Sequence, residues 1–267
     1  LNFIPQNDLS LGEASEEFED LLDKAVQCRL MSEVPLGAFL SGGLDSTLVV
    51  SAMAKRMTQP VLTNSIGFDL EEYNELPIAR SVADLFQTNH HEFTVQPKAI
   101  EVLDSISQHF DEPFADSSAL PTWYVCKMAK QNVTVALSGD GGDEGFGGYT
   151  FRYLPHIFES GLRSRLPTSF RSLVFGGLGT IYPGTARLPK PLRLKTIFEN
   201  LAISDAEAFY NDLVFLRSYD RNKLYSPEFT KSLHGFMPGE TVISLYNSNN
   251  ANDPLGRSQF TDINFYM

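Results

Sequence analysis

The sequence is poor in cysteine and has no long hydrophobic run. Two cysteines among 267 residues, Cys28 and Cys126, are too few for a disulfide scaffold or for a cysteine-built zinc or iron–sulfur site. Such sparse use fits a reducing compartment, and we expect the protein in the cytoplasm. No stretch approaches the roughly 18 apolar residues of a membrane span, and no charged-then-apolar leader opens the chain. The sequence therefore predicts neither a secreted disulfide-rich protein nor a membrane protein.

Basic residues are also scarce. The chain has 21 Lys and Arg against 33 Asp and Glu, which gives a net charge of −12. Such a chain is poorly suited to nucleic acid or an anionic membrane surface, so neither is expected as a partner. The acidic excess is confined to residues 1–150, with eight basic and 23 acidic residues (net −15); residues 151–267 hold 13 and 10 (net +3). We therefore expect a domain boundary near residue 150.

The chain has enough apolar residues, 42% of the total, to bury a substantial core, so disorder is excluded as its main state. Residues 1–12 predict a linker. Beyond it, apolar spacing predicts helices over 13–32, 44–57, 75–86, 97–109 and 119–131, and strands over 34–40, 61–68, 90–95 and 133–137. This alternation predicts an α/β fold with a doubly wound parallel sheet over residues 13–150. Residues 151–267 show no strand alternation and predict an appended, mostly helical part, including a helix over 205–216.

A glycine loop follows the first predicted strand and precedes a predicted helix, with the sequence Ser41-Gly42-Gly43-Leu44-Asp45-Ser46. Glycines allow backbone N–H groups to turn toward an anion, and the helix start adds its positive end. The Gly-Lys-Ser/Thr ending of the Walker loop is absent. Asp45 would repel a bare phosphate, which favours a phosphate accompanied by Mg²⁺. The alternative is a tight strand–helix turn with no ligand.

A second glycine-rich loop, Ser138–Tyr149, follows the last predicted strand and places three carboxylates among six glycines. By itself it could be a calcium turn or a plain flexible loop. Because ligands bind at the carboxyl ends of parallel strands, two such loops on one sheet predict a shared site. The sequence therefore predicts a phosphate site with acidic groups at its mouth.

The first loop matches the pyrophosphate-loop motif of the ATP pyrophosphatases. Together with 138–144 and Asp111-Glu112-Pro113-Phe114-Ala115-Asp116, the stretch 34–46 resembles the synthetase domain of glutamine-hydrolysing asparagine synthetases. The resemblance is strong from Glu16 to Tyr149 and weaker through the helical part. It implies an ATP-dependent ligase that adenylates the side-chain carboxylate of aspartate, giving β-aspartyl-AMP and pyrophosphate, after which ammonia displaces AMP and asparagine forms.

The resemblance also implies roles for individual residues. The AMP part of ATP would be lined by Leu40, Ile66, Ser138 and Gly139. The pyrophosphate would be held by Ser41, Gly42, Gly43, Asp45 and Ser46. Mg²⁺ would be ligated by Asp45 and Asp143, and Asp140 matches the acidic position that the family needs to form the acyl-adenylate. Such a reaction needs charge neutralisation and positioning more than a protein nucleophile.

The resemblance implies a partner and shows departures from the family pattern. An N-terminal glutaminase domain, which supplies ammonia in this family, is absent; the chain starts at Leu1 without Met, so we expect it to be a piece of a longer protein. The family's catalytic lysine lies beyond the last residue, so we expect the piece alone to be inactive. A homodimer is a further expectation. Gly145 stands where the family usually has leucine.

Weaker candidates and rival functions remain open. The acidic residues Asp111, Glu112 and Asp116, together with Glu144, could face the substrate, but the first three could instead cap the helix that follows. A related synthetase that adenylates another carboxylate, such as a β-lactam synthetase or a natural-product amidotransferase, would have the same adenylation loops. A non-catalytic nucleotide-binding regulator is the alternative from another class, and the intact loops argue against it.

Overall fold

The computed structural model describes residues 9–68, 74–96, 98–111, 114, 116–185 and 188–265. The chain forms two compact units, one spanning Asp8–Asp140 and one running from Gly141 onward. The division falls about ten residues before the boundary expected near 150. The reason is local: the short helix of the second glycine loop hydrogen-bonds to the helical unit through Gln259.

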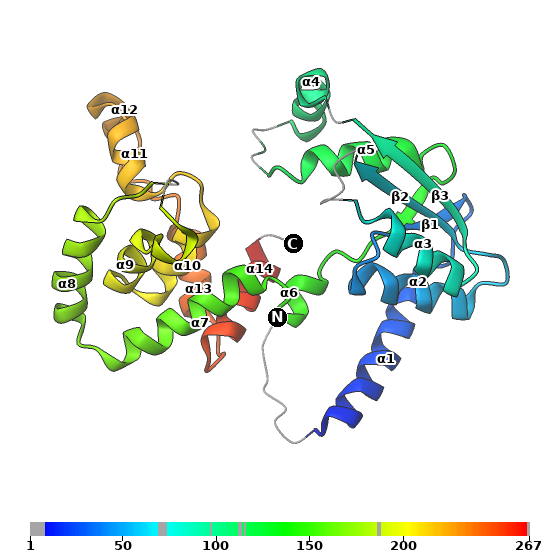
Figure 1. The fold of residues 1–267 in the computed structure, drawn as a ribbon, viewed down its shortest axis with the longest axis horizontal. Coiled ribbons are helices and arrows are strands. Elements are labelled where there is room, and N and C mark those ends of the chain that lie inside the picture. Colours follow the sequence, from blue (N-terminus) through cyan, green and yellow to red (C-terminus); the bar gives the residue numbers. More distant parts are fainter. Residues whose placement is uncertain are drawn as a thin grey trace. The chain divides into compact units, whose positions relative to one another are not determined.

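The first unit is an α/β unit (Figure 1). Its elements follow one another as α1 (Leu11–Gln27), β1 (Leu36–Phe39), α2 (Leu44–Arg56), β2 (Leu62–Phe68), α3 (Leu76–Leu85), β3 (Asn89–Val95), α4 (Ala99–Phe110), α5 (Ala119–Ala129) and β4 (Val135–Leu137). The four strands form one parallel sheet in the order β3-β2-β1-β4. This confirms the predicted α/β class and parallel sheet.

Helices cover both faces of the sheet. On one face α2 contacts β1, α3 contacts β2 and β3, and α1 packs on α2, in a core that includes Val26, Ala38, Leu40 and Met53. On the other face α5 contacts β2 (Figure 1). In the register, Ala38 of β1 lies between Thr63 of β2 and Leu137 of β4. The carboxyl ends of β1 and β4 therefore lie side by side, and the segments that follow them leave the sheet at the same edge.

The first helix departs from its predicted bounds. It begins at Leu11 because Ser10 and Glu13 form a capping box, in which the Ser10 hydroxyl accepts from the Glu13 N–H and the Glu13 carboxylate accepts from the Ser10 N–H. It ends at Gln27 instead of continuing to residue 32. The linker expected over residues 1–12 is thus shortened by the cap, and its first eight residues lie outside the described part of the chain.

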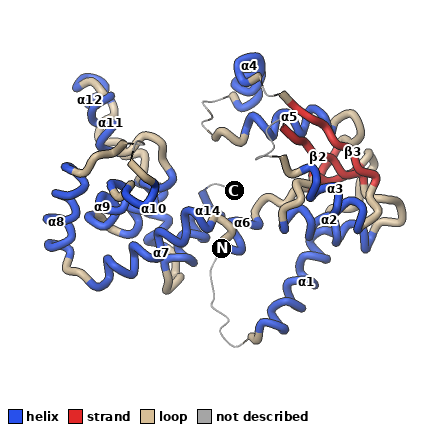
Figure 2. The backbone as a smooth tube through the Cα atoms, viewed as in Figure 1, coloured by secondary structure: helices blue, strands red, loops and turns tan. Residues whose placement is uncertain are grey.

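The second unit is helical, and Figure 2 shows no strand among its described residues. Its elements are α6 (Gly142–Phe146), α7 (Thr150–Arg165), α8 (Thr168–Ile181), the 3-10 turn η2 (Lys190–Leu192), α9 (Lys195–Ala202), α10 (Asp205–Leu213), α11 (Ser218–Leu224), α12 (Pro227–Ser232), α13 (Glu240–Ser248) and α14 (Pro254–Phe265). Its core gathers aromatic side chains, among them Tyr153, Phe209 and Tyr246. None of the described helices in either unit has the length and hydropathy that a membrane crossing requires.

Candidate functional site

The loop between β1 and α2 is held by its own serines. The Ser41 and Ser46 hydroxyls hydrogen-bond at 3.0 Å, the Ser41 N–H donates to Ser46 Oγ at 3.3 Å, and the Gly43 N–H donates to Ser41 Oγ at 3.2 Å. The start of α2 has no side-chain cap. The serine hydroxyls therefore accept hydrogen bonds from loop amides, and an anionic oxygen of a ligand could take their place as acceptor. Further backbone amides at the start of α2 are available to a ligand.

Glycines at two points of this edge are required by close contacts. Gly42 has φ +85°, and a Cβ there would lie 2.9 Å from the Ala79 nitrogen. Gly139, which follows β4, lies so near α2 that a Cβ would be 2.7 Å from the Ser46 nitrogen and 2.9 Å from the Asp45 carbonyl carbon. The segments after β1 and β4 thus meet at the helix start, as the sequence predicted for two loops on one sheet edge.

A cavity of about 370 Å³ lies beside this loop, within the size range of small-molecule sites. Among its lining residues are Leu40, Ser41 and Ile66, three of the residues expected around ATP. Ser138 and Gly139, expected around the AMP part, are not among them. The Ser138 hydroxyl donates to the Asp140 carboxylate at 2.8 Å, and Asp140 is exposed.

Sequence reasoning missed several lining residues of this cavity. They include Asn64 and Ser65 on β2 and Pro121, Thr122 and Val125 on α5. Asn64 is fully buried, and no described residue accepts from its Nδ2, while its Oδ1 accepts from Asn132 Nδ2 at 3.2 Å. The signal was present in the sequence as the polar run Thr63-Asn64-Ser65 inside a strand that is buried on both faces. A buried N–H donor without an acceptor destabilises the folded protein, so a ligand that accepts a hydrogen bond from Asn64 Nδ2 would bind more tightly.

Two predicted acidic residues, Asp143 and Glu144, belong to the helical unit. Both lie on α6, and Glu144 is only 3% exposed, accepting a hydrogen bond from the Tyr149 hydroxyl at 2.8 Å. Burial and this carboxylate raise the pKa of Tyr149 above its ordinary range. The Gln259 amide on α14 donates to the Glu144 and Gly145 carbonyl oxygens at 3.1 and 2.8 Å. Glu144 therefore anchors α6, so the structure favours a positioning role for it over contact with a substrate.

The acidic segment before α5 is described only in part. Asp111 ends α4 in the left-handed region with φ 58°. Asp116 Oδ1 accepts from the Ser118 N–H at 2.8 Å, just before α5, which favours the helix-cap alternative for this residue. Glu112 lies outside the described residues.

The carboxylate and hydroxyl groups of the loop between β1 and α2 suit a magnesium ion bound to pyrophosphate. Asp45 is half-buried in the first turn of α2, beside the two serine hydroxyls. No group of three His, Cys, Asp or Glu side chains within the described ranges could hold a metal alone. Mg²⁺ commonly binds through one or two carboxylates, phosphate oxygens and water, so a single carboxylate beside a phosphate site suits it.

Comparison with known proteins places this geometry in context. The family model for asparagine synthase matches residues 17–267. A putative glutamine-hydrolysing asparagine synthetase of Methanocaldococcus jannaschii is 49% identical over 136 residues, covering 50% of this chain and 26% of its own length. Glutamine-hydrolysing asparagine synthetase 1 of Bacillus subtilis is 28% identical over 94% of this chain and 38% of its own length. The chain thus spans about a quarter to two-fifths of these relatives.

Among solved structures, an NMN synthetase from Francisella tularensis covers 96% of this chain and 94% of its own, with 16% identity and a TM-score of 0.36. An agreement this low supports no conclusion about the fold or the function.

Proposed function

Because the chain belongs to the asparagine synthase family, we propose that its α/β unit binds ATP and activates the side-chain carboxylate of aspartate as β-aspartyl-AMP. Pyrophosphate is released, and ammonia then attacks the acyl carbon, so that AMP leaves and asparagine forms. The observation that carries this proposal is the serine-and-glycine loop at the start of α2, which Gly139 touches and a cavity containing Leu40 and Ile66 adjoins.

In this proposal the loop binds the pyrophosphate part of ATP. The amides of Ser41 and Gly43 exchange their serine acceptors for phosphate oxygens, and the hydroxyls become donors to the same group. The uncapped start of α2 adds its positive end. Gly42 and Gly139 keep this surface free of side chains. The adenosine part lies toward Leu40 and Ile66, with Ser138 and Gly139 completing its surroundings.

Charge neutralisation is the main chemical demand on the site. Asp45 would hold Mg²⁺, and Asp143 is proposed as a second ligand on the family resemblance alone; the bound ion would supply positive charge against the phosphate oxygens. Asp140 is exposed beside Ser138, and we propose that it serves formation of the acyl-adenylate. Adenylation then depends on positioning the aspartate carboxylate in line with the α-phosphorus, not on a nucleophile from the protein.

The proposal extends to the partners of this chain. The relatives are described as glutamine-hydrolysing, so we propose that ammonia reaches the site from a glutaminase domain. A homodimer is proposed on the family resemblance alone.

The decisive experiment is ATP–pyrophosphate exchange by the full-length protein with a panel of carboxylates, because we expect this piece alone to be inactive. We expect exchange of labelled pyrophosphate into ATP that depends on L-aspartate and Mg²⁺, because adenylation is reversible before ammonia attacks. Exchange that depends on another carboxylate would instead indicate a related synthetase. ATP binding with no exchange for any carboxylate would indicate a nucleotide-binding regulator.

A further inference from the structure

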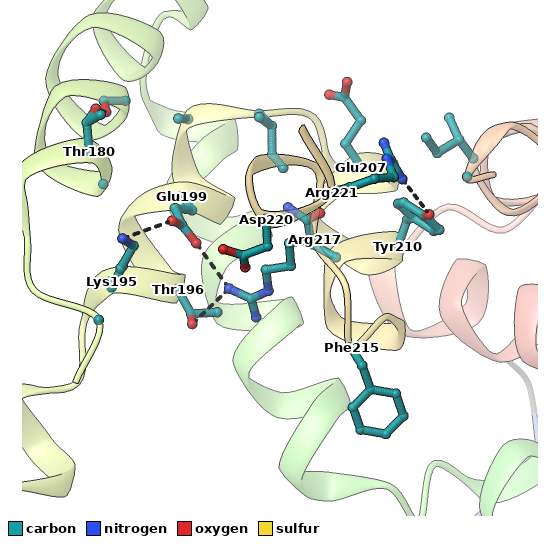
Figure 3. Close-up of a pocket in the computed structure, with 18 of the residues that line it drawn as sticks. Thr180, Lys195, Thr196, Glu199, Glu207, Tyr210, Phe215, Arg217, Asp220 and Arg221 are labelled. Atoms are coloured by element: carbon teal, nitrogen blue, oxygen red, sulfur yellow. Dashed lines mark hydrogen bonds and ion pairs between the residues drawn. The ribbon is translucent and has the colours of Figure 1, made fainter. Parts of the chain in front are cut away.

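The helical unit contains a cavity that the proposed reaction does not use. Its volume is about 1130 Å³, and residues of α8, α9, α10, α11, α13 and the connecting loops line it (Figure 3). Sites for small molecules usually measure about 300–1000 Å³, so this cavity can hold a metabolite with room to spare. Its charged side chains decide which kind of molecule would be recognised.

One wall carries an ordered guanidinium. Arg217 Nη1 donates to Thr196 Oγ1 at 3.0 Å and to Glu199 Oε2 at 3.1 Å, and the ammonium of Lys195 lies 3.9 Å from Glu199 Oε1. The side chains of Lys195, Glu199 and Arg217 are each between 26% and 28% exposed, so most of each is shielded from water. Both hydrogen bonds that Arg217 makes with described residues use Nη1, so Nε and Nη2 have no described acceptor and can donate to a ligand. A guanidinium fixed in this way is suited to a carboxylate, which accepts two parallel hydrogen bonds.

The carboxylate of Asp220 faces the same cavity. Asp220 lies on the first turn of α11 and makes no hydrogen bond or ion pair with any residue that the structure describes. In Figure 3 its carboxylate points toward the cluster of Glu199 and Arg217. The guanidinium and this carboxylate therefore share one cavity without pairing, and a molecule between them could bind both.

Three glycines lie close against residues that line this cavity. A Cβ on Gly179 would lie 3.1 Å from Glu199 Cγ, and one on Gly184 would lie 2.9 Å from Lys195 Cδ. A Cβ on Gly239 would lie 2.7 Å from the Tyr210 ring. A side chain at any of these three glycines would therefore press on a residue that lines the cavity.

We propose that this cavity binds a free α-amino acid, with its carboxylate on Arg217 and its ammonium group on Asp220. Among the lining residues that the structure describes, four cations (Arg193, Lys195, Arg217 and Arg221) are matched by four carboxylates (Glu199, Glu207, Asp220 and Glu240). A described lining with equal numbers of separated positive and negative groups favours a zwitterion over a simple anion. The inference rests on the proposed function only for the choice of amino acid, since asparagine is the proposed product and would report its own level at a second site.

Three probes of nearly equal shape test this site by calorimetric titration of the purified protein. L-Asparagine carries both charges, succinamate lacks the ammonium group, and β-alaninamide lacks the carboxylate. We expect asparagine to bind at least about tenfold more tightly than either analogue, because each analogue leaves one charged group of the cavity without its partner. Equal binding of succinamate and asparagine would overturn the proposal.

Two variants locate the binding. Asp220 is exposed and has no partner among the described residues, so Asp220→Asn should fold normally. This variant should bind asparagine and succinamate with about equal affinity. Arg217→Lys keeps the charge but removes the planar pair of donors, and should weaken asparagine binding by about tenfold. Binding that survives both changes but is lost in Asp140→Ala would place asparagine at the other site and overturn the proposal.

ATP–pyrophosphate exchange separates this inference from the proposed function. In the full-length protein, we expect both variants to retain exchange at the wild-type rate in the absence of asparagine. If asparagine binding responds to the two variants as described but the wild type shows no exchange, the amino-acid site stands and the proposed function fails. If exchange is present and asparagine does not bind, the site fails alone.

Discussion

The contact of Gly139 with the start of α2 allows the most direct structural test of the ATP site. In Gly139→Ala, the new Cβ would lie 2.7 Å from the Ser46 nitrogen and 2.9 Å from both the Asp45 carbonyl carbon and Cβ. An ordinary contact needs at least 3.4 Å, and two of these atoms belong to the backbone, so rotating a side chain cannot relieve the overlap. Overpacking of this kind costs about 1–3 kcal/mol.

The strain in Gly139→Ala is released by moving α2 or the loop before it, both of which belong to the proposed pyrophosphate site. If returning the loop to its binding geometry costs about 2 kcal/mol of the binding free energy, the affinity for Mg-ATP falls by about 30-fold. We also expect the melting temperature of the α/β unit to fall by about 3–10 °C. Calorimetric titration with Mg-ATP and thermal denaturation measure the two effects.

Gly145→Ala is the matched control, since it adds the same methyl group at a helical glycine where a Cβ meets nothing within 4 Å. It should leave ATP affinity unchanged and stabilise the helical unit by about 0.5–1 kcal/mol. If Gly139→Ala binds Mg-ATP as tightly as the wild type and melts at the same temperature, the close approach of the two loops plays no part in the site and our reasoning is refuted.

Three further predictions follow from individual side chains. In the full-length protein, Asp45→Asn and Asp143→Asn should each abolish Mg²⁺-dependent turnover while the melting temperature changes little; turnover that survives in one variant shows that its residue is not an essential ligand. Tyr149→Phe leaves the buried carboxylate of Glu144 without its hydroxyl donor, and should destabilise the helical unit by about 1–3 kcal/mol in urea unfolding, whereas an unchanged midpoint would contradict the anchor role. Burial lowers the pKa of His156 to about 4, so the free energy of unfolding should be unaffected by this residue above pH 6.5 and should decrease, by at most about 3 kcal/mol, as the pH falls from 6.5 through 4. His156→Asn should lack this loss of stability in acid. An equal loss in both proteins would exclude His156 as its source.

Much of the α/β unit could be predicted from the sequence because its signals are local. Short apolar runs alternating with amphipathic segments specify strands and helices, and the glycine loops mark where strands end. The predicted ends of helices differ from the structure where a single interaction determines the first residue of the helix. Ser10 and Glu13 start α1 two residues before the predicted position, and the loop after Gly141 contains the helix α6, which six glycines in twelve residues argued against.

The candidate site could be predicted in part for the same reason. Ser41, Ser46 and Gly139 meet because parallel neighbouring strands bring their carboxyl ends together, which follows from topology. The anchoring of Glu144 could not be foreseen, since the amide of Gln259 lies more than a hundred residues away along the chain. Nor does any local pattern reveal that Arg217 and Asp220 share a cavity, because that depends on the packing of five helices.

We propose that the full-length protein cleaves ATP between its α and β phosphates. The loop supports this because it offers serine hydroxyls and backbone amides but no Walker lysine. The nucleotide products that the full-length protein forms with L-aspartate, ammonium and Mg²⁺ can be separated by chromatography. We predict AMP and pyrophosphate in equal amounts with the asparagine formed, whereas stoichiometric ADP and phosphate would contradict the account.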